Sequence, residues 1–417
     1  ESYKRMTTMA IDNKDKKVLK SSIEREQNEV ACSAECEKIK GSKNLNVPHL
    51  RFPEFSGEWD SFKLVELGKF IGGGTPSSSN LSFWTGSIPW ISSSDIKEDN
   101  INNISISRYI TEDAIEKSAT KYCPAPVILI VSRVGVGKVA LSHTSLCTSQ
   151  DFCNIIDIKC HPVFLSYNLL RTMKRKSREV QGTSIKGITS DELQKIRVFI
   201  PKNKDEQNKI SNLLTLLDER IVTQNKIIED LKKLKSAISE RLFKGIEGSF
   251  VLLSDICDIV KGKQINGENL SESGNYYVMN GGTEPSGYYG DYNVDANAIS
   301  ISEGGNSCGY VQFNTSPFWS GGHCYSIQNI ADNVNNLYLY HYLKSNEDVI
   351  MKLRIGSGLP NIQKKDLAMF KIKVPAIEQQ ITISTFLSSL ERKAEIEERI
   401  QNAMLKEKQY LLHQMFI

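Results

Sequence analysis

The sequence lacks a long apolar run. Its longest purely apolar stretch is Val127–Val131, far short of the roughly 20 residues that a membrane-spanning helix needs. The opening segment, ESYKRMTTMAIDNKDKKVLK, has no apolar core of signal-peptide length. We therefore expect no membrane span, no export and a location in the cytoplasm.

Cysteine and histidine follow no pattern. The nine cysteines are irregularly spaced and contain no CxxC pair, which gives no disulfide framework and fits a reducing compartment. Cys32 and Cys36 stand four apart and His323 adjoins Cys324, yet neither pair completes a four-ligand set with zinc spacing. We predict no metal site.

Motifs for nucleotide binding and catalysis are incomplete. GGGTPSSS at 72–79 and GVGKVA at 135–140 lack the GK followed by Ser or Thr of a phosphate loop, so glycine-rich turns are the better interpretation. SPFW at 316–319 has one proline where the amino-methyltransferase tetrapeptide has two. Nothing specific supports catalysis or a cofactor in this chain.

Charge is weak overall and uneven locally. The net charge is +3, which does not identify a nucleic-acid binder. Residues 161–204 hold ten Lys or Arg against three Asp or Glu, centred on KRKSR at 174–178, and residues 344–374 hold seven against three. Such patches suit phosphate binding, although a solvated helix face explains either patch alone equally well.

What the sequence does have is an internal repeat. GTSIKGITSDELQKIRVFIP from Gly182 matches GSGLPNIQKKDLAMFKIKVP from Gly356, and each ends on an alternating strand that a proline stops. Upstream, segment 62–74 is similar to segment 250–262, whereas the middles between these segments differ. Two copies therefore share a frame, as expected of a binding protein that reads two different things on one scaffold.

The middles predict strands with long connections. VILIVS at 127–132 and NAISIS at 297–302 are short β-branched runs between Gly, Pro, Asn and Ser clusters. The aromatic segment YYVMNGGTEPSGYYGDYN at 276–293 suits either strand packing or stacking on bases, with packing the simpler interpretation.

Each copy ends in a long amphipathic helix with apolar residues at spacings of three and four. Neither helix can bury such a stripe alone, so we expect the two to pack as an antiparallel coiled coil, with Gln224 and Glu397 at the same stripe position. The alternative is that each helix packs on its own domain. The residues predicted to pack between the helices are Leu213, Leu217, Ile221, Ile228, Leu231, Leu234, Ile238, Phe386, Leu390, Ile400, Met404 and Leu411.

The paired frames resemble a known family. NVPHLRFPEFSGEWDSFKLVELGKFIGGGTPS from Asn46, EQNKISNLLTLLDERI from Glu206 and GSGLPNIQKKDLAMFKIKVPAIEQQ from Gly356 are similar to specificity subunits of type I restriction-modification systems. The resemblance covers about residues 46–417. It implies a mixed α/β or α+β fold with a pseudo-two-fold internal repeat, in which two target recognition domains are joined by the helix pair.

The resemblance also implies a domain map. Residues 46–202 and 246–375 would be the recognition domains, 203–245 and 376–417 the spacer helices, and 1–45 an N-terminal extension. That extension departs from the family pattern. It contains one predicted helix at 16–40, and we interpret it as a tail or docking arm.

The implied function is host defence through sequence-specific binding of double-stranded DNA at a split target site, in a prokaryotic cytoplasm. The chain would not be an enzyme by itself. It would dock two modification subunits, which hold S-adenosylmethionine and methylate adenine, and restriction subunits with motor and nuclease activity. The alternatives are a self-sufficient DNA methyltransferase or nuclease, which the missing methylation motifs disfavour, and a coiled-coil scaffold that binds no DNA.

Asn and Gln suit adenine, and Arg or Lys suit guanine, in the major groove, although each single candidate is equally well a turn or surface residue. Aligning Ser132 with Ser302 sets Arg133 against Glu303, so we assign a phosphate role to Arg133 and none to Glu303. The candidate DNA-binding residues are Ser94, Asp95, Arg133, Lys138, Gln150, Lys174, Arg175 and Lys186 in the first copy, and Asn280, Tyr288, Tyr292, Asn306, Arg354 and Lys364 in the second.

Overall fold

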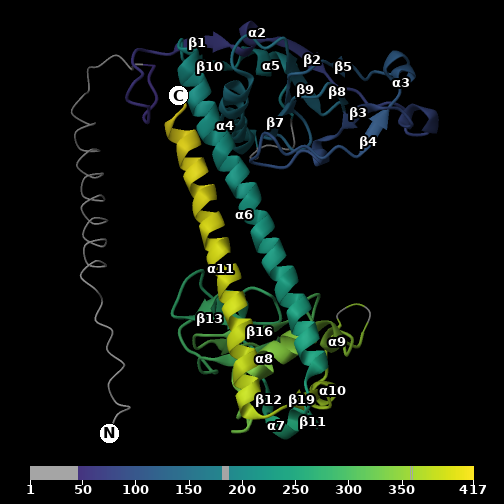
Figure 1. The fold of residues 1–417 in the computed structure, drawn as a ribbon, viewed down its shortest axis with the longest axis vertical. Coiled ribbons are helices and arrows are strands. Elements are labelled where there is room, and N and C mark those ends of the chain that lie inside the picture. The colour runs from purple at the N-terminus through teal and green to yellow at the C-terminus, as the bar shows by residue number, and fades with distance from the viewer. Residues whose placement is uncertain (1–45, 181–186, 357, 359) are drawn as a thin grey trace. The chain divides into compact units, whose positions relative to one another are not determined.

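The computed structural model describes residues 46–180, 187–356, 358 and 360–417. The chain divides into two compact units. The first unit takes the chain up to Thr215 together with Lys408–Ile417, and the second unit takes Leu216–Glu407. The helix predicted at 16–40 lies outside the described residues. Figure 1 labels many of the elements named below.

The first unit is built on an antiparallel sheet with the strand order β2-β9-β6-β7. These strands are Lys69–Gly72 (β2), Phe152–Ile156 (β9), Val127–Val131 (β6) and Val139–Ser142 (β7). Every residue of β6 is buried. Ile128 and Ile130 join the cluster formed with helix α4 (Pro162–Val180), whereas Val127, Leu129 and Val131 join a separate cluster. The apolar run is therefore a central strand that is covered on both faces.

A smaller mixed sheet completes the body of the first unit. Its order is β4-β3-β8-β5, with β3 and β8 parallel. The strands are Arg108–Ile110 (β4), Ile88–Ile91 (β3), Leu146–Thr148 (β8) and Tyr122–Cys123 (β5).

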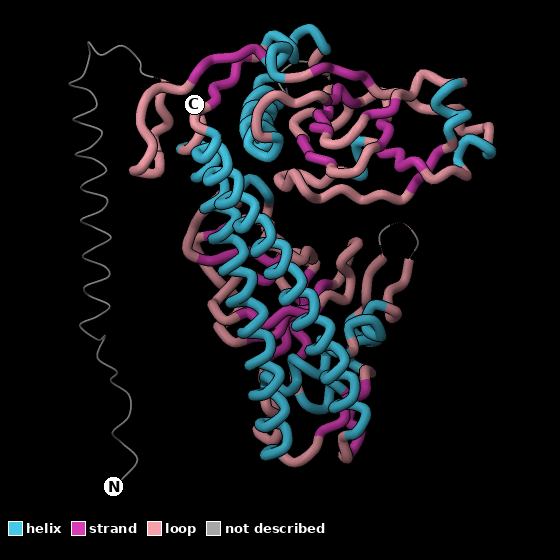
Figure 2. Tube along the Cα trace, turned by 45° about the horizontal axis from the view of Figure 1, so that its top comes forward, coloured by secondary structure: helices cyan, strands magenta, loops and turns pink. Residues whose placement is uncertain are grey.

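The second unit repeats this plan. Its main sheet has the order β12-β18-β15-β16, with strands Asp258–Lys261 (β12), Cys324–Gln328 (β18), Ala298–Ser302 (β15) and Val311–Asn314 (β16). In both units the first strand along the chain is followed across the sheet by the fourth, second and third. The smaller sheet is β14-β13-β17 (Tyr288–Tyr289, Tyr276–Met279 and Trp319–Ser320). Figure 2 shows the strands in magenta and the irregular connections in pink. The repeat thus extends through middles whose sequences differ.

The frame of each copy is a two-stranded antiparallel sheet. β1 (Asp60–Lys63) pairs with β10 (Arg197–Ile200), and β11 (Ser249–Leu252) pairs with β19 (Lys371–Val374). β10 and β19 end at the residues before Pro201 and Pro375, as predicted, because proline has no N–H to donate to the ladder. The short helices are α2 (Leu64–Leu67), α3 (Glu112–Glu116), α5 (Ser190–Lys195), α7 (Leu253–Ile256), α8 (Asn336–Ser345), α9 (Glu347–Met351) and α10 (Lys364–Ala368), with 3-10 turns η1 (Leu81–Trp84), η2 (Ser93–Asp95) and η3 (Gly267–Asn269).

A buried glutamine fastens each strand and its proline to the long helix that follows. Gln207 donates from Nε2 to the Pro201 carbonyl (2.9 Å) and accepts the backbone N–H of His161 at Oε1 (3.0 Å). Gln380 repeats both bonds with Pro375 (2.8 Å) and with the backbone N–H of the residue before α8 (2.8 Å). Each glutamine therefore joins three segments of its unit.

Two long helices, α6 (Lys204–Gly245) and α11 (Ile377–Gln414), follow the two-stranded frame sheets. Within the second unit they lie side by side (Figure 1) and are joined by polar bonds. Gln224 donates from Nε2 to Glu397 Oε2 (2.6 Å), so the predicted contact between these residues is confirmed. Lys235 Nζ lies 2.8 Å from Glu391 Oε1.

The burial pattern corrects part of the predicted stripe. Ile221 and Ile228 are buried as predicted, but Leu234, Phe386 and Ile400 are 49%, 46% and 39% exposed. The inward position is the next residue in the first two cases, Lys235 and Leu387. One residue turns a helix by about 100°, so a stripe that follows hydrophobicity alone drifts off the buried face. The other predicted residues, Leu213, Leu217, Leu231, Ile238, Leu390, Met404 and Leu411, are half-buried.

The last residues of each long helix complete a core. Phe416 lies in the first unit's core, with its ring 6.5 Å from Trp59 and 5.1 Å from Phe164. Phe243, near the end of α6, lies in the second unit's core, 5.1 Å from Tyr342. α6 thus begins in the first unit and ends in the second, and α11 does the reverse.

Candidate nucleic-acid interface

The backbone fixes how the two units correspond around the ends of β6 and β15. Ser132 N donates to the Asp151 carbonyl (2.8 Å) and its carbonyl accepts from Ile188 N (2.7 Å). Glu303 makes the same two bonds, with the carbonyl of His323 (2.9 Å) and with the N–H of Ile362 (2.8 Å). Glu303 is therefore the counterpart of Ser132. The predicted alignment of Glu303 with Arg133 is wrong by one residue, because the following loops differ in length; Gly304 corresponds to Arg133.

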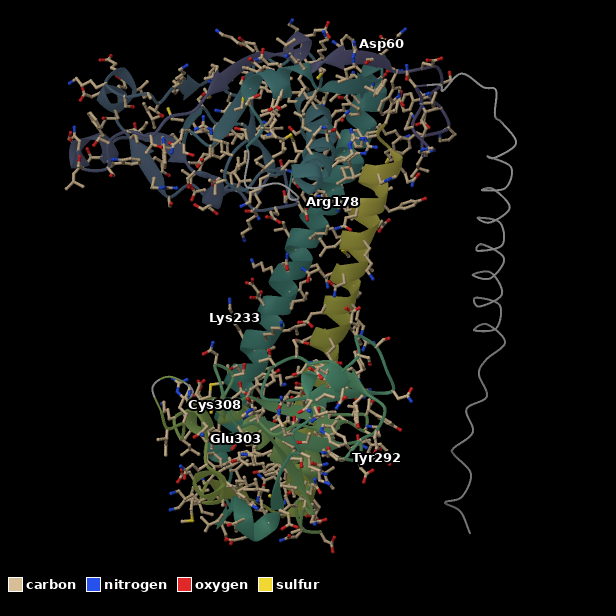
Figure 3. All side chains as sticks on the ribbon, turned by 180° about the vertical axis from the view of Figure 1, so that it is seen from behind. Asp60, Arg178, Lys233, Tyr292, Glu303 and Cys308 are labelled. Atoms are coloured by element: carbon tan, nitrogen blue, oxygen red, sulfur yellow. The ribbon has the colours of Figure 1, made fainter. Side chains whose placement is uncertain are left out.

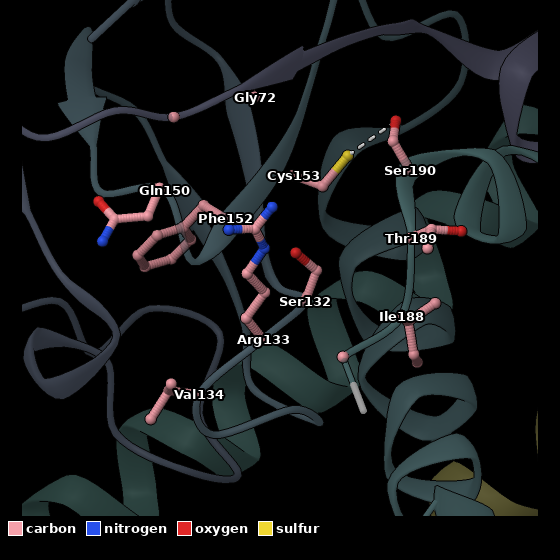
Figure 4. Close-up of a pocket in the computed structure, with 12 residues that line it drawn as sticks. Gly72, Ser132, Arg133, Val134, Gln150, Phe152, Cys153, Ile188, Thr189 and Ser190 are labelled. Carbon is pink, nitrogen blue, oxygen red and sulfur yellow. Dashed lines mark hydrogen bonds between the residues drawn. The ribbon is translucent and has the colours of Figure 1, made fainter. Parts of the chain in front are cut away.

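A cleft of about 600 Å³ opens in the first unit beside Arg133. The ends of β2, β6 and β9 and the segment before α5 form it, and Figure 4 shows the Arg133 guanidinium pointing into it. Two predicted DNA-binding residues, Arg133 and Gln150, line the cleft together. The other lining residues are Gly72, Gly73, Ser132, Val134, Phe152, Cys153, Gly187, Ile188, Thr189 and Ser190.

The cleft offers hydrogen-bond donors. Among the described residues, the Arg133 guanidinium has no hydrogen-bond or ion-pair partner, and its side chain is exposed. Gln150 Oε1 accepts from the Thr75 hydroxyl, which leaves the two N–H groups of its amide nitrogen free to donate. No Asp or Glu is among the lining residues. An occupant that accepts hydrogen bonds therefore fits this site.

The candidates at residues 94 and 95 belong to a different loop. The Asp95 carboxylate accepts the N–H of Ser92 (2.7 Å) and forms an ion pair with Arg108, whose guanidinium lies 4.6 Å from the centre of the Trp90 ring. Ser94 is exposed, with its hydroxyl 2.8 Å from that of Ser92. Asp95 thus holds this loop together, and reading a base with it would require breaking the pair with Arg108.

Two further basic candidates of the first unit, Lys138 and Lys174, have an acidic neighbour. Lys138 and Lys174 line a small cavity of about 220 Å³ together with Asp99, which pairs with Lys174. Lys138 Nζ also donates to the carbonyl of Ser93 (3.2 Å). Arg175 is exposed. Lys186 lies outside the described residues.

The candidates of the second unit are spread over several loops. Asn280 Oδ1 accepts the N–H of His323 (3.0 Å), which ties it to the backbone. The ring of Tyr292 lies 4.9 Å from that of Tyr276, so aromatic packing accounts for this part of the tyrosine-rich segment. Tyr288 is half-buried in β14, and Asn306, Arg354 and Lys364 are exposed.

Glu303 stands in the second unit at the position that Ser132, which lines the cleft, has in the first. Glu303 is 7% exposed and is labelled in Figure 3 near Cys308. The Cys308 thiol lies 3.0 Å from the carbonyl oxygen of Glu303. Glu303 Oε1 lies 2.7 Å from Lys261 Nζ and 3.1 Å from the Tyr325 hydroxyl. Glu303 Oε2 is buried without a hydrogen-bond partner among the described residues, 3.9 Å from His323 Nδ1.

Several cleft residues were not predicted. Gly72, Cys153 and Thr189 carry no motif, and only their shared position at the ends of neighbouring strands and at the frame segment brings them together.

The described thiols do not suggest nucleophilic chemistry: burial raises the pKa of Cys123 to about 11 and that of Cys324 to about 11, which keeps both protonated at neutral pH. Within the described residues, no three His, Cys, Asp or Glu side chains gather as metal ligands, and no helix could cross a bilayer.

Two copies of one mixed α/β body, each fastened to a long helix, define a tandem repeat protein. The family model described as the type I restriction modification DNA specificity domain matches the chain twice, over residues 56–233 and 247–406. The chain therefore belongs to this family, and the resemblance drawn from the sequence is confirmed.

Individual relatives carry the same description. The chain is 32% identical over 199 residues to the type I restriction enzyme MjaIX specificity subunit of Methanocaldococcus jannaschii, which covers 46% of this chain and 45% of that protein. It is 34% identical over 192 residues to the EcoR124I/EcoR124II specificity subunit of Escherichia coli, covering 44% and 46%. The chain thus spans about half the length of the curated relatives it matches.

Solved structures share the fold. The crystal structure of the S subunit from M. genitalium aligns with a TM-score of 0.62 at 20% identity, over 89% of this chain and 99% of that one. A second structure, described in terms of complex assembly and conformational transition of the type I R-M system, aligns with a TM-score of 0.55 at 16% identity, over 88% and 98%.

Proposed function

We propose that this chain is the sequence-specific DNA-binding specificity subunit of a type I restriction-modification complex, and that it has no catalytic activity by itself. The observation that carries the proposal is the repeated frame with unlike sites. The same order of strands in the main sheet and the same two-stranded frame sheet occur twice. One body nevertheless presents Arg133 in an open cleft and the other a buried Glu303. Two readers of different sequences on one scaffold have this form.

Each unit would then read one half of a split site. In this proposal residues 46–202 and 246–375 are the recognition domains, and α6 and α11 pack as an antiparallel coiled coil that sets the gap between the halves. The cross-helix bonds support that pairing, because Asn225 bonds to Gln401 and Lys235 to Glu391, so the partner number on α11 falls as the number on α6 rises. One turn of DNA spans roughly 34 Å, so a longer helix pair would leave more bases unread.

The partners follow from the family. The proposed complex contains two modification subunits, which supply S-adenosylmethionine and methylate adenine, and restriction subunits, all in a prokaryotic cytoplasm. The name of the E. coli relative, a subunit of a restriction enzyme, supports an assembly of this kind.

Exchange of residues 60–186 for the same segment of another specificity subunit tests the proposal. Sequencing of methylated adenines in cells that carry the hybrid should show one half of the site changed and the other half retained. Exchange of residues 249–370 is the matched control and should change only the other half. Alteration of both halves by either exchange would overturn the assignment of one reader to each unit.

Two binding measurements test the class of function. Gel-shift titration of the full chain with duplex DNA should show affinity that falls as salt rises, because neutralised phosphates release counterions. Absence of any DNA affinity would instead favour a protein scaffold. Tight binding of S-adenosylmethionine by the isolated chain would favour a self-sufficient methyltransferase.

A further inference from the structure

Three equivalent positions differ in size between the two units. The strand registers place Gly72 opposite Cys153 in the first unit and Lys261 opposite Tyr325 in the second. The backbone bonds described above match Ser132 with Glu303. The first unit therefore has Gly, Ser and Cys where the second has Lys, Glu and Tyr.

The three larger side chains bond to one another in the second unit. Lys261 Nζ lies 2.7 Å from Glu303 Oε1, and the Tyr325 hydroxyl lies 3.1 Å from the same oxygen and 3.0 Å from the carbonyl of Ile362. In the first unit a Cβ atom on Gly72 would meet nothing within 4 Å. The cleft of about 600 Å³ thus borders small residues in the first unit, whereas larger side chains that bond to one another stand at the equivalent positions of the second.

The chemistry of the open cleft favours the edge of a base over a phosphate. Among the described residues that line the cleft, Arg133 is the single cation, and no second charge is present there to share a phosphate. Val134, 65% exposed beside Arg133, gives the rim an apolar surface that suits a base. An arginine without a partner among the described residues is the side chain that binds O6 and N7 of guanine with two bonds, and Gln150 adds a further donor.

We infer that the cleft of the first unit is a base-reading site for guanine, centred on Arg133, and that the second unit has no reader at the equivalent place because Lys261, Glu303 and Tyr325 occupy it. The inference rests on the proposed function, since it assumes that the first unit meets DNA. It adds which group of the DNA enters and why the two half-sites are read differently.

The test uses the full chain and a pool of duplexes with randomised positions, followed by sequencing of the bound fraction. Wild type defines the base preference at each position. Arg133→Ala should lose the preference for guanine at one position of one half-site by roughly ten- to a hundred-fold, with the other positions unchanged. Arg133→Lys should keep part of it. Lys121→Ala, which removes an exposed cation that is neither in the cleft lining nor among the DNA-binding candidates, is the control and should leave that preference intact.

Filling the cleft is the second arm. Ser132→Glu alone, and together with Gly72→Lys and Cys153→Tyr, should produce the same loss at the same position, while thermal unfolding shows that the variants are folded. Glu303→Ser should leave every base preference of the other half-site in place. If the triple variant does not fold, Ser132→Glu carries this arm.

Three results would overturn the inference. Uniform weakening by Arg133→Ala with a shallower salt dependence would make Arg133 a phosphate contact. Unchanged preferences in Arg133→Ala and Ser132→Glu would remove the site but leave the proposed function standing. A wild-type chain that selects no sequence at all would remove the proposed function and the reading site together.

Discussion

The first and second units carry unlike side chains at positions where their backbone hydrogen bonds agree. Ser132 and Glu303 make the same pair of backbone hydrogen bonds, yet Ser132 borders an open cleft and Glu303 is a buried carboxylate. The frame glutamines Gln207 and Gln380 show the opposite behaviour, because the residue type and both bonds are kept. The comparison teaches that this fold holds its geometry with backbone and frame contacts, which leaves the side chains at the strand ends free to change.

The largest expected effect comes from the aromatic side chains that complete each core. Phe416→Ala should destabilise the first unit by about 3–5 kcal/mol through loss of buried area and creation of a cavity, and Phe243→Ala should do the same to the second unit. Urea unfolding followed by tryptophan fluorescence separates the two, since Trp59 lies against Phe416 and Trp319 belongs to the second unit. Phe386→Ala, at an exposed position, is the control; a loss there as large as at Phe416 would contradict the burial pattern.

The next largest effect should come from lowering the pH, which should destabilise the second unit more than the first. Burial lowers the pKa of His341 to about 4, whereas the unfolded chain takes up this proton near 6.5. The contribution is fully present above pH 6.5 and is lost as the pH falls from 6.5 to 4, which amounts to about 3 kcal/mol. Urea unfolding of the second unit at several pH values measures it.

The groups around His341 keep this assignment clear. Burial alone would raise the pKa of Glu391, but Lys235 holds it below its usual value, so Glu391 stays ionised over most of that range. Burial also lowers the pKa of His161 in the first unit, which should therefore show a weaker loss of the same sign. His341→Gln should flatten the pH profile of the second unit, while His413→Gln, at an exposed position, should not. An unchanged profile in His341→Gln would exclude the histidine as its cause.

The glutamine pair should give a smaller effect that is shared by both units. Gln207→Ala and Gln380→Ala each leave a buried carbonyl without a partner, which costs about 1–3 kcal/mol, and also free a partly buried N–H. Gln380 makes one bond more, to the carbonyl of Asn333 (3.0 Å), so its loss should be the greater. Denaturation midpoints of the two variants make the comparison, and a larger loss for Gln207→Ala would contradict it.

The smallest effect should fall on an exposed position of a long helix. Leu234→Ala should change the free energy of unfolding by less than about 0.5 kcal/mol, as at other exposed positions. Ile228→Ala, at a buried position of the same helix, should cost about 2–5 kcal/mol. Equal losses in the two variants would restore the stripe predicted from hydrophobicity.

Local signals made the frame predictable. The strands at 197–200 and 371–374 and their prolines follow from alternation and from the missing N–H of proline, and both are confirmed. Leu234 was predicted in the stripe because it lies three residues after Leu231 and four before Ile238. The fold instead places Lys235 inward, since Glu391 is there to pair with it.

The candidate site was predictable only in part. Arg133 and Gln150 were chosen for their chemistry, and the fold brings them to one cleft. The cleft itself could not be predicted, because it depends on three small residues, Gly72, Ser132 and Cys153, that only the folded chain brings together. Glu303 was matched to the wrong residue for a related reason. Strand register depends on long-range pairing, and a comparison of two loops of unequal length does not contain that information.

The position of Phe416 has a consequence for the order in which the chain acquires its structure during synthesis. Domains usually fold from the N-terminus onward as the ribosome releases them. Here the first unit needs Lys408–Ile417, which are translated after all of Leu216–Glu407. The second unit can therefore close first, and the first unit must wait, with part of its apolar core uncovered, until Lys408–Ile417 have left the ribosome.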